Sequence, residues 1–196
     1  MYSLNVHLLL SVFVLVNLCD GCAGRFSIFL KQNWECKPLS IGGETTNPSA
    51  MDLDMRIERV GRGEFFFSGT FFWNIDLDDS VLVEMQILRS HSGSEADYKL
   101  TPWSIPQQTF IEYIDTFYKD LLMANLGDCT DLPRYDSGYV PPWPKGTFNF
   151  TRCGIKGDGL PEVLVEGFYK VQAIITALPT VQQNITAIIQ VTLKMF

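Results

Sequence analysis

The amino-acid sequence predicts a mainly β protein, in which antiparallel strands form a β-sandwich and one helix closes an edge or an end. Two observations support this prediction. At least six segments alternate apolar and polar residues, which is typical of strands with one buried face. One segment, 107–126, instead repeats its apolar residues every three or four positions, as an amphipathic helix does. One-sided strands need a second layer to cover their apolar faces, and sandwich packing is the usual solution.

The first predicted strands lie between residues 54 and 87. In the segment 54–60, Met55 and Ile57 share one face, whereas Arg56 and Glu58 share the other. The segment 64–75 is the richest in aromatic residues, and the segment 81–87 follows it after a polar turn at 76–80. The positions of these two strands that are predicted to point inward are Phe65, Phe67, Gly69, Phe71, Trp73, Ile75, Val81, Val83, Met85 and Ile87.

The predicted helix is flanked by the residues that usually mark helix ends. Pro106 lies at its start and Gly127 lies just past its end. The segment 128–146 that follows is rich in proline and glycine and is predicted to lack regular structure. The apolar face of the helix contains Phe110, Ile114, Phe117 and Leu121.

Three further strands are predicted in the last third of the chain, at 147–153, at 167–177 and in the final segment. In the final strand the residues from Ile185 to Met195 alternate between an apolar and a polar face. Two glycosylation sequons, which begin at Asn149 and Asn184, place their asparagines on polar strand faces. A glycan attached at either position would reach water, which suits an exported protein.

The N-terminal residues predict secretion. Residues 8–18 form an apolar run, LLLSVFVLVNL, which is too short to span a bilayer and is followed by small residues. We therefore expect a signal peptide over 1–24, cleaved after Ala23 or Gly24, and a single domain over 25–196. A buried first strand would be the structural alternative, although it would need no cleavage-like tail. No second apolar run is long enough for a transmembrane segment.

Cysteine pairing follows from this expected compartment. Cleavage would remove Cys19 and Cys22 and leave three cysteines, which tend to pair in an oxidising environment. Cys129 and Cys153 are the predicted disulfide, because they enclose the proline- and glycine-rich segment. Cys36 would remain as a buried thiol or would form a bridge to another chain.

The sequence offers little for catalysis, and we expect no enzyme, no cofactor and no metal. Beyond the leader, the one histidine is His91, in a polar loop, and no G-x-S-x-G motif accompanies it. Asp76, Asp78 and Asp79 fit a turn better than a calcium loop. The glycines at 154, 157 and 159 do not fit a phosphate-binding pattern. A glycosidase-like pair of carboxylates cannot be located from spacing alone. The net charge of −7 argues against nucleic acid as a partner.

Several segments resemble a secreted insect family. The segments are WECKPLS at 34–40, the F-x-G-T-F-x-W-N stretch at 67–74, FYKDLLMANLGDCTDLP at 117–133, and the run from 141 to 176 that contains Cys153, Leu160-Pro161 and GFYKV at 167–171. Together they are similar to the CheB chemosensory proteins of flies. That family is in turn similar to the lysosomal ganglioside activator, a member of the lipid-recognition sandwich superfamily. The resemblance implies a role in contact (gustatory) chemosensation, in which such proteins help to detect pheromones.

These observations leave three functions, of which the first is favoured. It is a secreted protein that binds hydrophobic small molecules, such as long-chain lipids or hydrocarbons, and aids pheromone detection. The second is an extracellular modulator that docks on a receptor or channel and holds no ligand. The third is an enzyme. For the first, the candidate pocket residues are Phe65, Phe67, Phe71, Trp73, Val83, Met85, Ile87, Phe110, Ile114 and Phe117.

Overall fold

Two antiparallel sheets and one helix make up the part of the chain that the computed structural model describes, which is residues 32–62, 64–135, 137–177 and 179–194. The predicted signal peptide and Met195 lie outside these residues. The larger sheet has the order β1-β9-β8-β4-β5, with β6 also pairing with β4, and the smaller sheet has the order β2-β3-β7. The predicted mainly β fold with a single helix is confirmed.

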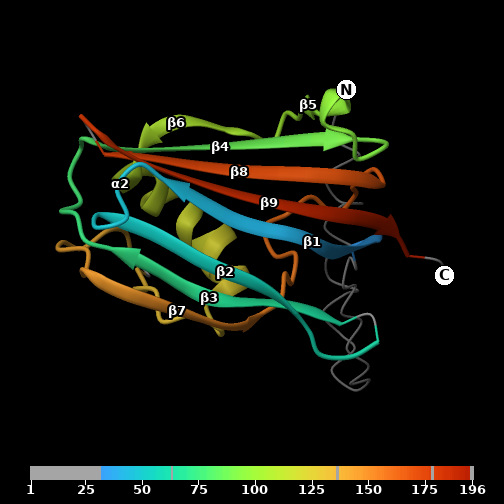
Figure 1. The fold of residues 1–196 in the computed structure, drawn as a ribbon, viewed down its shortest axis with the longest axis horizontal. Helices are drawn as coiled ribbons and strands as arrows, with labels where there is room; N and C mark the ends of the chain where they lie inside the picture. The colour runs from blue at the N-terminus through green and yellow to red at the C-terminus, as the bar shows by residue number, and fades with distance from the viewer. Residues whose placement is uncertain (1–31, 63, 136, 178, 195–196) are drawn as a thin grey trace, which may run out of the picture. The chain divides into compact units, whose positions relative to one another are not determined.

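The larger sheet contains strands from both ends of the described chain (Figure 1). The long hairpin of β8 and β9 forms its centre, with Ala177 opposite Val181 at the turn. β4 flanks the hairpin on one side and β1 flanks it on the other. The strands are β1 (Trp34–Thr45), β4 (Val81–Ser90), β5 (Lys99–Leu100), β6 (Ile105–Thr109), β8 (Gly167–Ala177) and β9 (Val181–Leu193).

The smaller sheet meets the larger one where β2 lies beside β1 (Figure 1). Gly43 is required at this junction, because a Cβ atom there would lie 2.8 Å from Gln183 Nε2 and 2.8 Å from Leu53 Cβ. Gln183 is completely buried, and its side-chain amide donates to the carbonyl oxygen of Asn184. The strands of the smaller sheet are β2 (Met51–Arg59), β3 (Phe65–Trp73) and β7 (Gly146–Cys153).

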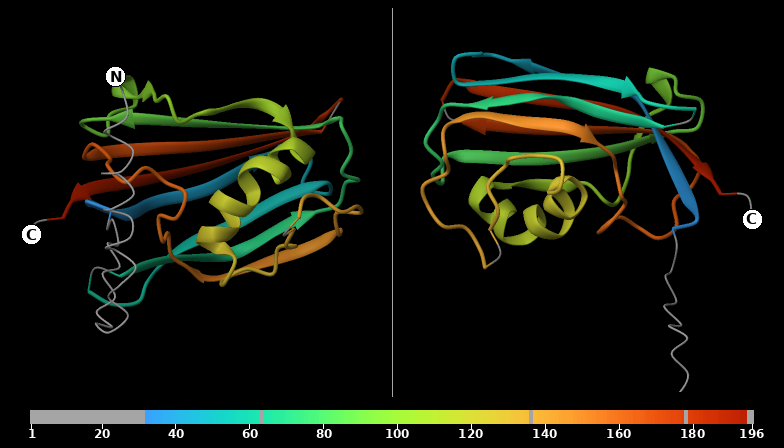
Figure 2. Two further views of the ribbon diagram at one scale, coloured as in Figure 1. Left: turned by 180° about the vertical axis from the view of Figure 1, so that it is seen from behind. Right: turned by 90° about the horizontal axis from the view of Figure 1, so that it is seen from below.

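The helix crosses the side of the sheets that is turned away from the viewer in Figure 1 (Figure 2, left). It consists of α2 (Phe110–Tyr113), η2 (Ile114–Met123) and α3 (Ala124–Leu126) in one continuous run, and a one-turn helix, η1 (Glu95–Asp97), lies elsewhere. η2 is wound as a π-helix, in which the Ala124 N–H donates to the carbonyl oxygen of Lys119. The helix therefore covers the interior between the two sheets.

The helix begins three residues later than the proline at 106 suggests. Residues 105–109 form β6, in which Gln108 lies opposite Val83 of β4. The helix starts after Thr109, whose hydroxyl accepts from Glu112 N while the Glu112 carboxylate accepts from Thr109 N, both at 3.1 Å. This capping box satisfies two backbone donors at the helix start and so fixes the boundary.

Candidate functional site

Aromatic side chains fill one end of the space between the sheets and the helix. Trp143 lies at the centre of this end and is 3% exposed. Its ring centroid lies 5.7 Å from that of Trp73, 5.4 Å from Phe110 and 5.8 Å from Tyr118. Phe148 adds a further contact at 6.2 Å. We call these five residues the aromatic block.

The other end of the same space is a cavity of about 800 Å³. This volume lies within the range that is usual for small-molecule sites. The cavity is bounded by residues of the larger sheet, by the helix from Tyr113 to Leu126 and by the loop 154–166, with Ile57 and Phe67 from the smaller sheet. The lining includes Pro38 and Ile41 from β1, Met85 and Ile87 from β4, Tyr169 and Val171 from β8, Ala187 and Ile189 from β9, Tyr113, Phe117, Leu121, Leu122 and Leu126 from the helix, and Ile155, Leu160, Pro161 and Leu164 from the loop.

The cavity opens to solvent mainly between the helix and two loops. Apart from Ser40 on β1, its exposed lining residues come from three segments. The segment 102–106, which joins β5 to β6 and includes the start of β6, contributes Pro102, Trp103, which is 38% exposed, and Pro106. The helix contributes Thr116 and Asp120, which are one turn apart, and the loop contributes Gly159. We call this opening the mouth.

The cavity wall is almost entirely apolar, because its larger side chains are Ile, Leu, Met, Pro, Phe and Trp. Asp120 is the one charged residue among the described residues that line it. Tyr113 also lines the cavity and is 4% exposed. Burial raises the pKa of Tyr113 to about 12, so its hydroxyl stays uncharged at neutral pH. The wall therefore suits a ligand whose surface is mostly hydrocarbon.

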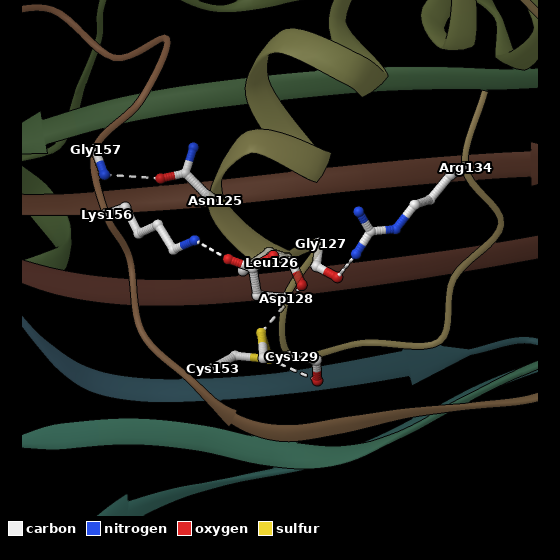
Figure 3. A network of polar contacts seen from close by, with 9 residues as sticks. All are labelled: Asn125, Leu126, Gly127, Asp128, Cys129, Arg134, Cys153, Lys156 and Gly157. Atoms are coloured by element: carbon white, nitrogen blue, oxygen red, sulfur yellow. Dashed lines mark hydrogen bonds and ion pairs between the residues drawn. A yellow bond between two sulfur atoms is a disulfide. The ribbon is translucent and has the colours of Figure 1, made fainter. Parts of the chain in front are cut away.

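Hydrogen bonds hold the loop 154–166 against the end of the helix (Figure 3). Asn125 is buried, and its side-chain oxygen accepts from Gly157 N while its amide donates to Asp158 O, each at 2.7 Å. Lys156 forms an ion pair with Asp128, just past the helix. These contacts give the cavity a fixed wall on the loop side.

The far part of the same loop is fastened to the larger sheet. The Trp34 indole N–H donates to Pro161 O at 2.9 Å, and the Tyr169 hydroxyl donates to Val165 O at 2.8 Å. Trp34 and Tyr169 also pack with Leu164 in a small core cluster of their own. Close packing at Gly159 adds a steric constraint, because its φ is +72° and a Cβ atom would lie 2.4 Å from Asp120 O.

Four of the ten predicted pocket residues line the cavity. They are Phe67, Met85, Ile87 and Phe117. The structure places Phe71, Trp73, Val83, Phe110 and Ile114 in the main core cluster instead. Phe65 lies under two cations, with Lys37 Nζ 5.0 Å and the Arg59 guanidinium 5.9 Å from its ring centroid. These six side chains are buried or half-buried, as predicted, but none of them lines the cavity.

Much of the lining comes from segments that the sequence analysis did not recognise as part of a site. Pro102 and Trp103 lie in the short connection between β5 and β6, which has no apolar periodicity, and Pro106 lies in β6. β1 was not predicted as a strand, because Pro38 and the pair Gly42 and Gly43 interrupt its pattern. Ala187, in contrast, lies on the apolar face that the alternation of residues 185–195 predicts for the final strand, so a signal for this part of the lining exists in the sequence.

The predicted disulfide between Cys129 and Cys153 is confirmed, with 5.3 Å between the Cα atoms. It joins the end of the helix to the end of β7 (Figure 3). Cys36 is a free, half-buried thiol, and burial raises its pKa. Of the two sequon asparagines, Asn149 is exposed and Asn184 is half-buried, each on its strand.

The residues that were considered for catalysis or metal binding lie apart from the cavity or serve a structural role. His91 is exposed. Asp78 caps its own turn, where the Ser80 side chain donates to it at 2.6 Å and lowers the pKa of the carboxyl group. Within the described ranges no group of three or more His, Cys, Asp or Glu side chains is arranged to hold a metal ion. No helix in those ranges is long and apolar enough to cross a membrane.

The comparisons with known proteins match the central part of this fold. A family described as "Protein of unknown function (DUF1091)" matches residues 83–171. This stretch runs from β4 through the helix to the first residues of β8, and so includes the mouth, the loop 154–166 and the disulfide. No curated protein matches the chain. The fold and the cavity together define a mainly β protein with an apolar interior site.

Proposed function

We propose that this protein is a secreted, non-enzymatic carrier whose cavity holds a long-chain hydrophobic ligand. The observation on which the proposal rests is the apolar cavity of about 800 Å³, which opens to solvent at one end. An empty apolar space of this size is costly in a protein interior, because the lining side chains lose contacts that close packing would supply. Occupation by a ligand would restore those contacts.

The energy available from such a ligand is sufficient for useful affinity. Each methylene that is transferred from water to an apolar site contributes about 0.8 kcal/mol. A chain of ten carbons would gain about 8 kcal/mol by this measure. The cost of association reduces that gain, and micromolar binding would still remain for somewhat longer chains. Long-chain lipids and hydrocarbons therefore fit the proposal better than small polar compounds do.

The resemblance to the CheB chemosensory proteins extends the proposal to a biological role. A carrier of this kind would move a poorly soluble pheromone through aqueous lymph to a gustatory receptor. The apolar leader at 8–18, the two sequons and the disulfide all suit an extracellular protein. The similarity of that family to the ganglioside activator also agrees with a lipid-binding interior.

A cavity-filling variant tests the carrier function. Ala187 lines the cavity from the middle of β9, so Ala187→Phe should occupy part of the volume and weaken ligand binding by at least about tenfold. The control is Gln190→Phe, which adds the same ring to the outer face of the same strand. Binding is measured by displacement of N-phenyl-1-naphthylamine, a neutral apolar fluorophore, from the secreted protein.

Native mass spectrometry of the protein secreted by insect cells is a second test. A co-purified lipid mass that is lost in Ala187→Phe and kept in Gln190→Phe supports the carrier. Equal displacement curves for wild type and Ala187→Phe would refute a ligand in this cavity, provided that circular dichroism shows both proteins folded.

Docking on a receptor or channel without a ligand is the second candidate. The observation in its favour is Cys36, which has no disulfide partner among the described residues. Mass analysis under non-reducing conditions distinguishes a bridge between chains from a free thiol. A clean apo mass together with a disulfide-linked dimer would favour this candidate over the carrier.

A further inference from the structure

The mouth of the cavity has a negatively charged residue on its helix side, and this charge affects which ligand head groups can bind there. Asp120 lies on the helix at the mouth, is exposed and carries the one charge among the described lining residues. Thr116, one turn before it, donates its hydroxyl to Glu112 O at 2.7 Å. Its oxygen can then only accept a further hydrogen bond. The helix side of the mouth therefore presents acceptors and a negative charge.

None of the basic residues nearest to the mouth along the chain lines the cavity. Lys156 is paired with Asp128, Lys119 lines a separate hollow beside Asp115 and Tyr139, and Lys99 is exposed on β5, opposite Arg89 of β4. The opposite rim contains Trp103 and two prolines, which carry no charge. The net charge of the whole chain, −7, adds to the negative field rather than opposing it.

We infer that the cavity selects ligands with an uncharged head group that donates a hydrogen bond, such as a long-chain alcohol, over ligands with an anionic head group, such as a free fatty acid. This inference rests on the proposed carrier function. A hydroxyl at the mouth can donate to the Asp120 carboxylate, and the hydrocarbon chain extends into the apolar wall. A carboxylate at the same place would lie beside another carboxylate, and the described lining residues include no cation to neutralise it, which weakens binding.

The test compares two ligands with the same chain. 1-Tetradecanol and tetradecanoate compete with N-phenyl-1-naphthylamine for the wild-type protein at neutral pH and low ionic strength. We expect the alcohol to bind at least about tenfold more tightly than the acid, since two like charges at close range disfavour each other by that order even near a surface. Added salt should narrow the difference.

Two substitutions at Asp120 separate charge from shape. Asp120→Asn should strengthen tetradecanoate binding by about tenfold and change alcohol binding much less, because the amide keeps an acceptor and loses the charge. Asp120→Lys should reverse the preference in favour of the acid. The matched control is Asp54→Asn, which removes one carboxylate from the exposed face of β2.

The outcomes distinguish the two proposals. Equal affinities of the alcohol and the acid for wild type, unchanged in Asp120→Asn, would overturn the selection at the mouth and leave the carrier function standing. Failure of both ligands to displace the fluorophore would overturn the carrier function and the inference with it. A gain in acid binding that Asp54→Asn reproduces would assign the effect to net charge and would also overturn the inference.

Discussion

Tryptophan at three positions shows how the same residue type takes different roles in this protein. Trp73 and Trp143 lie in the aromatic block, with 0% and 3% of their surfaces exposed, whereas Trp103 lies at the mouth and is 38% exposed. The sequence predicts that Trp73 lines the pocket. The structure places it behind the cavity, where its indole N–H donates to Ile75 O at 2.9 Å. Its main role is therefore packing.

This difference predicts the effect of truncation on stability. Trp143→Ala should lower the free energy of unfolding by about 3–5 kcal/mol, because a large buried ring leaves a cavity that its neighbours cannot fill. Urea denaturation of the purified protein measures the change. The control, Trp103→Ala, should cost no more than about 1 kcal/mol, as expected for a partly exposed residue. Similar losses for the two variants would contradict this assignment.

Tyr113 should make the fold sensitive to alkaline pH. Its pKa is about 12 in the folded state because of burial, against an ordinary value of 10.0. The unfolded chain therefore ionises first as pH rises, and the stability contributed by the neutral buried hydroxyl is present below pH 10 and is lost between about pH 10 and pH 12. By pH 12 the loss is about 2 kcal/mol.

Replacement of the hydroxyl isolates this contribution. Tyr113→Phe should show a shallower decline of melting temperature between pH 9 and pH 12 than wild type, as followed by circular dichroism. Parallel declines would mean that another group, such as Tyr118, governs the alkaline transition. The pKa of Tyr118 is also raised by burial.

At the scale of elements, the loop 154–166 and the helix depend on each other through Asn125. This buried side chain donates to Asp158 O and accepts from Gly157 N, so its removal leaves the buried Gly157 N–H without this partner and breaks the bond to Asp158. Asn125→Ala should therefore destabilise the loop and accelerate amide hydrogen exchange within residues 154–166 at least about tenfold. Exchange detected by mass spectrometry measures this directly.

An exposed asparagine provides the matched control. Asn74 donates to Ser49 O at 3.3 Å on the protein surface, and Asn74→Ala should leave exchange in the loop unchanged. If Asn125→Ala also leaves the loop unchanged, the loop is held mainly by the contacts of Trp34 and Tyr169 with its far end.

Elements with regular periodicity could be predicted from the sequence, and elements set by tertiary contacts could not. β8 and β9 alternate cleanly, and the sequence predicts both strands and the apolar face of β9. β1 contains Pro38 and the pair Gly42 and Gly43, and it forms because β9 offers a complete edge for it to pair with. A local pattern carries no information about that partner.

The same limit applied to the pocket. Alternation tells which side chains point inward, and it does not tell which part of the interior remains empty. Met85 and Phe71 were both predicted to point inward, yet Met85 lines the cavity and Phe71 lies in the packed core. Phe71 packs against Trp73, which packs in turn against Trp143 from a segment with no regular structure, and the local pattern around Phe71 gives no sign of that partner.

At the scale of the whole molecule, the disulfide joins the helix to the smaller sheet across a sequence separation of 24 residues. In the chain-entropy model, a bridge that closes a loop of this length contributes about 3.5 kcal/mol. The double variant Cys129→Ser/Cys153→Ser should lose about that much unfolding free energy in urea.

Each single variant should fail to be exported from insect cells, because it leaves an unpaired thiol. Normal export of the single variants would argue against a requirement for the bridge during folding.

The aromatic block closes one end of the interior, and this should limit the length of the alkyl chain that the protein can bind. An alkyl tail that enters at the mouth can advance only as far as the buried end of the lining, where Tyr113 packs against Phe110 of the aromatic block with 5.9 Å between the ring centroids. In a homologous series of alcohols, each added carbon should raise affinity roughly fourfold while there is depth to fill, and should add nothing once the tip reaches the rings. The chain length beyond which the measured affinity no longer rises would give the depth of the cavity that a ligand can use.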